Sequence, residues 1–453
     1  MTHAPKLPGP RGHWLLGALP HLRRDMLGFF EECAREHGDA AYFRVANRRS
    51  MLLSHPDDIE RVLVTENRRF HKNYAIMFLR PLLGNGLLLN EGQSWLRQRR
   101  LIQPAFARPR VEGYAPGMIA CTERLIEPWS DGQTLDIVAA MMQLTMSIAG
   151  RTLLGIDVGQ QFREVERCLD EVMHDFLYRF GAALPLPTWV PTPRNLRLKA
   201  AISKLDRILQ QLIDERRAAG VVGNDFLSLL LHARDEDDGQ GISDRQIRDE
   251  VITMFVAGHE TTAVTLSWTW LLLAQHPEIQ ERAAAEAQRV LGGKSPSADN
   301  VSHLVFCESV IRESMRLYPP AFVIGRRSAE DQTIGNHFVP ANTNVLMSQW
   351  VVHRDARWFS EPLHFNPDRW TNGSVENLPK YAYFPFGGGP RVCIGNTFAM
   401  FEATLVLAII ASRFRLELIT PTPIRMQPAV TLRPGQSIEM RIRAVGNALR
   451  GVP

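Results

Sequence analysis

The chain has 453 residues, of which 45% are hydrophobic and 22% charged, with a formal net charge of +4 at pH 7. This is the composition of a globular protein with a large core, and the charge is too small to indicate nucleic-acid binding. The cysteines are sparse and form no CxxC or His-x-x-His cluster, which argues against zinc and suits a reducing compartment. They are Cys33, Cys121, Cys168, Cys307 and Cys393.

The amino-terminal stretch MTHAPKLPGPRGHWLLGALP contains no long apolar run. It therefore predicts neither a signal peptide nor a stable membrane anchor, and we expect a cytoplasmic protein.

The first third of the chain predicts short helices and one pair of strands. A helix is expected over 24–37, strands over 40–45 and 50–54 with a turn at 47–49, and a helix over 56–63. The stretch 67–90 has no clean period and predicts a loop. A further helix contains Trp95 and Arg99, which lie four residues apart and so share one face.

Two helices are predicted over 160–183 and 196–218. The proline-rich connection 184–195 between them, which contains Trp189, predicts an apolar exposed lip. The acidic stretch 235–241 predicts a surface loop.

A long helical pattern begins after Ser243, a good N-cap residue, and runs to about Gln275. Its length would be roughly 50 Å. Because the pattern is apolar almost all round, the helix should be buried. A membrane span is the alternative, but the polar run His259 to Thr262 in its middle argues against burial in lipid.

The last third predicts further helices over 277–290, 301–317 and 397–414, and strands over 333–334, 337–339, 344–348 and within 415–443. Glu313 and Arg316 are three residues apart and can pair on one helix face, although this spacing alone is a weak signal.

Cys393 lies between a glycine-rich turn and the helix predicted over 397–414. A thiolate is favoured near a helix N-terminus, where unpaired N–H groups carry partial positive charge, and only the thiolate is a good metal ligand. A buried structural cysteine is the alternative for a lone Cys. A phosphate loop is excluded because no Gly-Lys-Ser/Thr comes after the glycines.

The full pattern around this cysteine is F-x-x-G-x-R-x-C-x-G, formed by Phe386, Gly389, Arg391, Cys393 and Gly395. It closely resembles the haem-binding loop of the cytochrome P450 monooxygenases. The run AGHETT, from Ala257 to Thr262, is similar to the family's oxygen-binding motif A-G-x-[DE]-T, and Trp95 with Arg99 matches its W-x-x-x-R. The resemblance extends over essentially the whole chain.

The resemblance implies a mainly α fold with a smaller β-rich lobe (α+β), in one domain over residues 1–453. The β-rich lobe is expected at about 38–65, 320–380 and 415–445, and the α-rich lobe at about 66–318 and 386–414. It also implies a haem-thiolate monooxygenase, from a bacterium, that inserts one oxygen atom of O2 into an apolar molecule. The cofactor is haem b, with electrons from NAD(P)H through separate redox partners.

The resemblance also assigns roles to residues. Cys393 would be the axial iron ligand, Phe386 and Gly395 would flank it, and Trp95, Arg99, Arg326 and Arg391 would contact the propionates, with adjacent Arg327 a weaker choice than Arg326. Thr261 and Glu260 would handle the protons needed to split O2, while Ala257 and Gly258 would leave room above the haem. Glu313, Arg316 and Arg369 would form a buried structural network.

The expected substrate pocket is apolar, with no charge to bind a head group. Its candidate residues are Ile76, Met77, Phe78, Phe180, Phe255, Ala257, Ala321, Phe322, Val323 and Leu432. A fatty acid, a terpenoid and a steroid would all suit it, with a long-chain fatty acid slightly favoured on overall resemblance.

We expect a monomer whose electron donor, a ferredoxin or flavodoxin-type protein with its reductase, docks on a basic patch of Arg97, Arg100, Arg108 and Arg110. Two alternatives stay open: an enzyme that uses peroxide or rearranges its substrate, and a haem sensor. The intact Glu260–Thr261 pair argues against the first.

Overall fold

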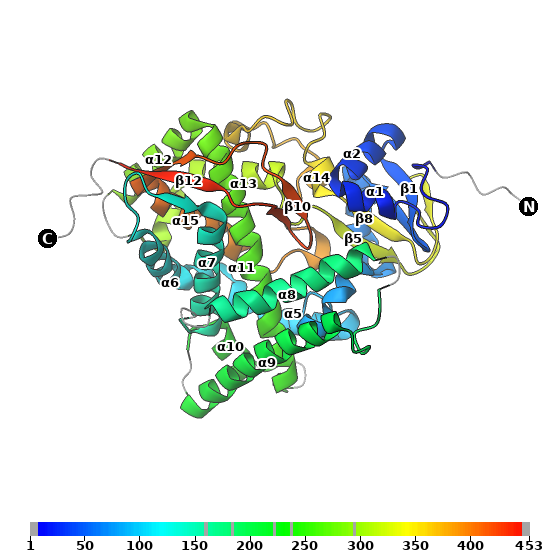
Figure 1. The fold of residues 1–453 in the computed structure, drawn as a ribbon, viewed down its shortest axis with the longest axis horizontal. Helices are drawn as coiled ribbons and strands as arrows, with labels where there is room; N and C mark the ends of the chain where they lie inside the picture. The colour runs from blue at the N-terminus through cyan, green and yellow to red at the C-terminus, as the bar shows by residue number, and fades with distance from the viewer. Residues whose placement is uncertain are drawn as a thin grey trace, which may run out of the picture.

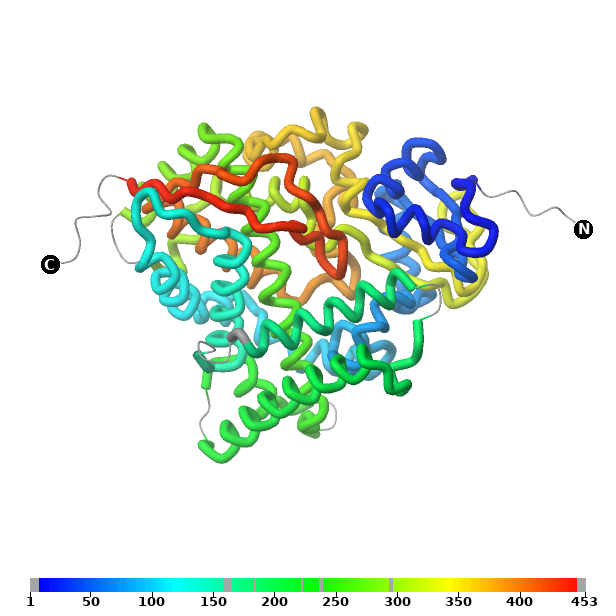
Figure 2. Tube along the Cα trace, in the orientation of Figure 1, coloured from blue at the N-terminus to red at the C-terminus, as the bar shows by residue number. Residues whose placement is uncertain are grey.

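The computed structural model describes residues 8–157, 162–182, 185–220, 223–235, 239–292 and 296–445. Parts of three predicted elements lie outside the described residues. These are residues 160, 161 and 183 of the predicted helix 160–183, residue 184 of the connection 184–195, and residues 236–238 of the predicted surface loop 235–241. Figure 1 shows a helical body with a small sheet at one side, and the same arrangement can be followed along the chain in Figure 2. The mainly helical prediction is therefore confirmed.

The helices have these bounds: α1 Leu19–Arg24, α2 Met26–His37, α3 Pro56–Glu60, α4 Arg80–Leu83, α5 Gly92–Ile102, α6 Arg108–Ile126, α7 Ile137–Ala149, α8 Phe162–Gly181, α9 Pro193–Ala219, α10 Phe226–His232, α11 Asp244–Gln275, α12 Pro277–Leu291, α13 Val305–Leu317, α14 Gln349–Val352 and α15 Asn396–Arg413. The strands are β1 Ala40–Val45, β2 Arg48–Leu53, β3 Phe70–Lys72, β4 Thr134–Asp136, β5 Ile324–Ser328, β6 Gln332–Ile334, β7 His337–Val339, β8 Asn344–Met347, β9 Phe414–Leu418, β10 Met426–Pro428, β11 Leu432–Pro434 and β12 Glu439–Ala444.

Helix α11 runs through the middle of the molecule and organises the helical body (Figure 1). The Ser243 hydroxyl accepts a hydrogen bond from the Gln246 backbone N–H at 3.3 Å, and the helix ends at Gln275, as predicted. It packs against α7, α13 and α15, and most of its residues from Val251 onward are buried. The backbone is α-helical over all of Asp244–Gln275, including Gly258.

The largest sheet has the strand order β1-β2-β8-β5-β3, with β2 and β8 parallel and the other pairs antiparallel. Its edge strand β3 pairs with β5 so that Lys72 stands opposite Arg326. This register brings two cations from distant parts of the chain to the same end of the sheet.

Three predicted boundaries are wrong. Arg48 and Arg49 belong to β2, and the turn is Ala46–Asn47, since Val45 pairs with Arg48 in a two-residue hairpin. Residues 298–303 form a separate 3-10 turn before α13. The segment 349–380, assigned to the β-rich lobe, contains short helices and loops and no strand, because its backbone folds around buried arginine side chains.

In the described ranges of the chain, two helical stretches could cross a membrane by length and hydropathy alone, Ile137–Leu154 and Asn396–Arg413. Of their residues, 61% and 67% respectively are buried inside the fold, as is usual for core helices.

Candidate active site

A cavity of about 700 Å³ lies between α11 and the loop that contains Cys393. Ala257, Gly258 and Thr261 line it from α11, and Phe386 and Cys393 line it from the loop. The Cys393 side chain is exposed to this cavity, whereas the other four cysteines are buried. The two motifs, more than a hundred residues apart in sequence, therefore face one space.

The backbone before Cys393 is a tight loop that only certain residues can form. The Cys393 N–H donates to the Phe386 carbonyl at 3.0 Å. Gly389 has φ +65°, and a Cβ there would lie 1.9 Å from the Leu63 carbonyl oxygen, so a side chain is excluded. Burial raises the pKa of the Cys393 thiol, while the Gly395 backbone N–H and the charge of Arg99 oppose that rise. The loop thus already provides partners for a thiolate.

Four cations gather at one side of the same cavity without a carboxylate partner: Lys72, Arg99, Arg326 and Arg391. Arg99 donates to the Val392 carbonyl at 2.9 Å and Arg391 to the Asn90 carbonyl at 2.8 Å, and the Arg391 guanidinium lies 4.3 Å from the centre of the Trp95 ring. Among the described residues, no ion pair within 4.0 Å is formed by any of the four.

Burial lowers the pKa of all four groups, most for Lys72, where the charges of Arg326 and Arg391 add to the effect. The charge of Glu91 opposes this fall for Lys72, Arg326 and Arg391. One carboxylate does not balance four partly buried cations, so the cluster fits a ligand that carries more than one negative charge. The two propionates of a haem beside the Cys393 sulfur meet that requirement, and the apolar remainder of the cavity suits its ring.

The family model described as Cytochrome P450 matches residues 7–440. The chain belongs to the cytochrome P450 family. Among its relatives are two proteins of Streptomyces melanosporofaciens. One is cyclooctat-9-en-7-ol 5-monooxygenase, 37% identical over 90% of this chain and 89% of the relative. The other is cyclooctatin synthase, 36% identical over 94% and 92%. The pentalenene oxygenase of Streptomyces avermitilis is 33% identical over 90% and 91%.

The protein is thus a cytochrome P450 monooxygenase with a haem cofactor, which inserts one oxygen atom of O2 into an apolar small molecule. Its electrons come from NAD(P)H through separate redox partners. When bound, the haem supplies the oxygen-activating chemistry.

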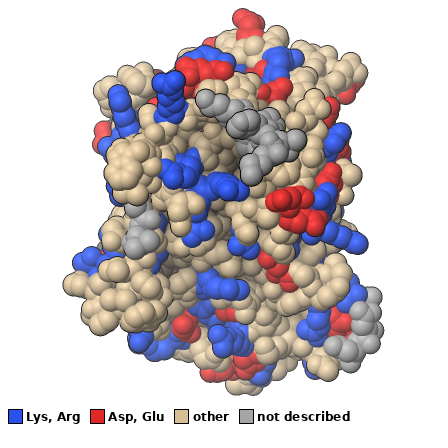
Figure 3. All heavy atoms as spheres, turned by 90° about the vertical axis from the view of Figure 1, so that its right-hand side faces the viewer, with Lys and Arg blue, Asp and Glu red and all other residues tan. Residues whose placement is uncertain are grey.

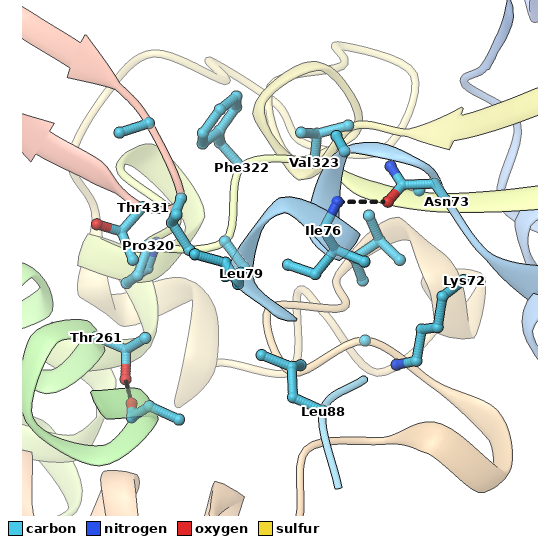
Figure 4. A pocket seen from close by; sticks show the side chains of 18 of the residues that line it. Lys72, Asn73, Ile76, Leu79, Leu88, Thr261, Pro320, Phe322, Val323 and Thr431 are labelled. Atoms are coloured by element: carbon cyan, nitrogen blue, oxygen red, sulfur yellow. Dashed lines mark hydrogen bonds between the residues drawn. The ribbon is translucent and has the colours of Figure 1, made fainter. Parts of the chain in front are cut away.

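On the oxygen-binding motif of this P450, the Thr261 hydroxyl donates to the Ala257 carbonyl at 2.7 Å (Figure 4). Thr261 also lines the cavity. The neighbouring Glu260 also lines the cavity, but its carboxylate is turned toward the carboxy-terminal hairpin, where Thr431 and Arg433 bind it.

The expected structural network is present and fully buried. Glu313 accepts two hydrogen bonds from Arg316, at 2.8 and 2.9 Å, and one from Arg369 at 3.2 Å. Trp370 Nε1 also donates to Glu313 at 3.0 Å. The remaining Arg316 donors bind backbone carbonyls, so every charge has partners.

Most of the expected pocket residues line the cavity, as do Leu79, Leu88 and Pro320 (Figure 4). Ile76, Phe78, Phe180, Ala257, Ala321, Phe322 and Val323 are among them. Three expected residues do not. Met77 lies between Ile76 and Phe78 in a 3-10 turn and points elsewhere. Phe255 stacks on His259, off the cavity face of α11, and Leu432, the first residue of β11, is buried in the core.

Several residues at the site escape prediction from the sequence. One of them is Lys72, which joins Arg99, Arg326 and Arg391 at the cavity. Arg326 was the predicted choice, and it lines the cavity where Arg327 does not. The expectation of an uncharged pocket is wrong, because Arg48 also lines it, with its guanidinium 3.3 Å from the centre of the Tyr74 ring. Figure 3 shows basic side chains around a hollow on this side of the molecule.

Proposed function

We propose that this P450 hydroxylates a terpenoid. The observation that carries the proposal is the apolar wall of the cavity away from Cys393, which is formed by Leu79, Leu83, Phe176, Phe180 and Phe322. The names of the Streptomyces relatives support a terpenoid over the fatty acid that the sequence slightly favoured.

Cys393 is proposed as the axial thiolate, with Phe386 and Gly395 beside it. Lys72, Arg99, Arg326 and Arg391 would bind the propionates, and Trp95 would support Arg391 from one face. These assignments rest on the sulfur in the cavity and on the four partly buried cations, none of which forms an ion pair within 4.0 Å in the described part of the chain.

Thr261 and Glu260 are proposed to hold and pass the protons that the reaction consumes. A hydroxyl facing the cavity can donate to a bound oxygen species, and a neighbouring carboxylate can replace the proton it gives. Ala257 and Gly258 leave space beside them, since a Cβ on Gly258 would meet only Leu153, at 3.7 Å.

The electron donor is proposed to be an acidic ferredoxin or flavodoxin-type protein that docks on the patch of Arg97, Arg100, Arg108 and Arg110. The patch is partly neutralised, since Arg97 and Arg100 pair with Asp235 at 3.1 and 3.6 Å, and Arg108 pairs with Glu112. All three arginines remain at least one-third exposed, which leaves charge for steering a partner.

We further propose a cytoplasmic monomer that acts as one domain, because the sheet and the helices both contribute to the single cavity around Cys393.

The substrate proposal is tested by titrating the ferric protein with terpenoids, steroids and fatty acids of similar size. Displacement of water from iron by a substrate shifts the spin state. A saturable shift with terpenoids, and then a hydroxylated product with a surrogate reductase, is the expected result. A shift confined to fatty acids would contradict it.

A further inference from the structure

The carboxylate of Glu260 is held by the carboxy-terminal hairpin of β10 and β11. Its Oε1 accepts hydrogen bonds from the Thr431 hydroxyl at 2.5 Å and from Arg433 Nε at 2.8 Å. Glu260 is only 3% exposed, so these two donors take the place of water around its charge. Within the described part of the chain, its Oε2 accepts no hydrogen bond, and the side chain lines the cavity.

Arg433 connects this buried carboxylate to the surface. Its side chain is 24% exposed, and its Nη1 lies 3.9 Å from Oδ1 of Asp170 on α8, a carboxylate that is 54% exposed. Arg433 therefore lies between the buried Glu260 on α11 and the exposed Asp170 on α8. The other titratable groups that face them are His259 beside Glu260, and Glu171 and His174 beside Asp170.

The same hairpin also touches the substrate space. Ala429, Val430 and Thr431 line the cavity at the hairpin tip, and Figure 4 shows Thr431 on the same side of the cavity as Thr261. A molecule in the cavity can thus contact Thr431, which is one of the two residues that hold Glu260.

We propose that Arg433 and Thr431 are positioning residues, which hold one oxygen of Glu260 in an ion pair and leave the other free to exchange protons with the cavity. The proposal rests on the proposed function, in which Glu260 and Thr261 handle protons. It adds that the hairpin of β10 and β11, which is far from the AGHETT motif in sequence, controls the orientation and the charge of the Glu260 carboxylate.

The alternative is that Arg433 only balances a buried charge. The two roles predict different effects when Arg433 is removed. Burial alone would raise the pKa of Glu260, but Arg433, together with Thr431 and His259, outweighs burial so that this pKa is lowered. Without Arg433 the carboxylate should take up a proton, lose its fixed orientation and supply protons poorly, whereas the loss of a mere charge balance would leave product formation unchanged.

The test compares Arg433→Gln with Arg425→Gln in the haem-loaded enzyme. Arg425 is exposed on the same hairpin and donates to the Gly435 carbonyl, without contact to Glu260, so it is a matched control. Two quantities are measured. The first is the amount of product formed per NAD(P)H consumed, which is the coupling ratio. The second is the protonation state of Glu260, from the infrared difference spectrum between each protein and the same protein that also carries Glu260→Gln.

In Arg433→Gln we expect product per NAD(P)H to fall by about tenfold, with hydrogen peroxide in its place, and a protonated Glu260 band at neutral pH. Arg433→Lys should restore both quantities in part, and Arg425→Gln should match the wild type. A coupling ratio in Arg433→Gln equal to that of Arg425→Gln, or an ionised Glu260 in both, would overturn the proposal.

If Arg433→Gln does not bind haem, the coupling ratio is measured in Thr431→Val instead. This variant removes one hydrogen-bond donor to Oε1 of Glu260 without a change of charge. A wild-type coupling ratio in Thr431→Val would then overturn the proposal. If the wild type itself forms no product, the proposed function fails, and the infrared comparison still judges whether Arg433 controls the charge of Glu260.

Discussion

Nε2 of the buried His353 accepts a hydrogen bond from the backbone N–H of Phe384 at 2.9 Å, and the His353 carbonyl accepts one from Arg316 at 2.9 Å. Burial and the charge of Arg316 hold the pKa of His353 well below its usual range, so the ring is neutral and can accept. This residue joins the Glu313 network to the loop that ends at Cys393, and it explains how a charge cluster outside the cavity supports the cofactor site.

The first prediction concerns this network. Glu313→Ala would leave Arg316 and Arg369 buried without a counter-charge, and we expect the free energy of unfolding to fall by about 3–5 kcal/mol, with loss of haem. Urea unfolding and haem content measure the two effects. Glu308→Ala on the same helix is the control, because Glu308 is 37% exposed and its surface pair with Arg312 contributes at most about 0.5 kcal/mol. Equal losses in both variants would refute the role of the network.

The second prediction concerns Lys72, whose substitution should weaken haem retention but stabilise the apoprotein. Lys72→Met should speed the transfer of haem to apomyoglobin by roughly tenfold, because a charged partner of the propionates is lost. The same substitution should stabilise the apoprotein, because it removes a desolvated cation that Arg326 and Arg391 repel. Lys199→Met, at an exposed position on α9, should change neither quantity. Unchanged haem transfer in Lys72→Met would contradict the propionate assignment.

The third prediction concerns Thr261. Thr261→Ala should keep haem and substrate binding but divert electrons to hydrogen peroxide several-fold more than the wild type does. Ser267→Ala is the matched control, since Ser267 is a buried hydroxyl on the same helix that donates to the Ala263 carbonyl at 2.7 Å and does not line the cavity. Tight coupling in Thr261→Ala would count against a role in proton delivery.

The fourth prediction is a pH dependence. Burial raises the pKa of Glu250 to about 7, only partly offset by hydrogen bonds from the Leu87 N–H and Gln246. The folded state thus binds a proton that the unfolded state has released, and the stability due to this group is complete below about pH 4.5 and is lost as the pH rises through 7. Its slope is at most about 1.4 kcal/mol per pH unit.

Glu250→Gln keeps an acceptor for the Leu87 N–H and removes the titration. The stability of this variant, from urea unfolding between pH 5 and about 8, should therefore fall less with pH than that of the wild type. If the free energy of unfolding changes with pH in the same way in both proteins, Glu250 does not have the raised pKa in the folded state.

Features of the fold and the site could be predicted from the sequence where residues close together in the chain determine them. Helix α11 was predicted to its ends because Ser243 caps it and its apolar run is continuous. Lys72, His353 and Arg433 could not be found, because each reaches the site through strand register or loop packing between distant segments. Phe255 was misplaced because a helix that is apolar all round does not reveal which face lines a cavity.

The central claim is that Cys393 binds haem iron as a thiolate, and the carbon monoxide spectrum of the reduced protein tests it most directly. We predict the red-shifted Soret band that a thiolate ligand produces in the wild type, and its loss in Cys393→Ser. A wild type without that band, or a Cys393→Ser variant that retains it, would contradict the account.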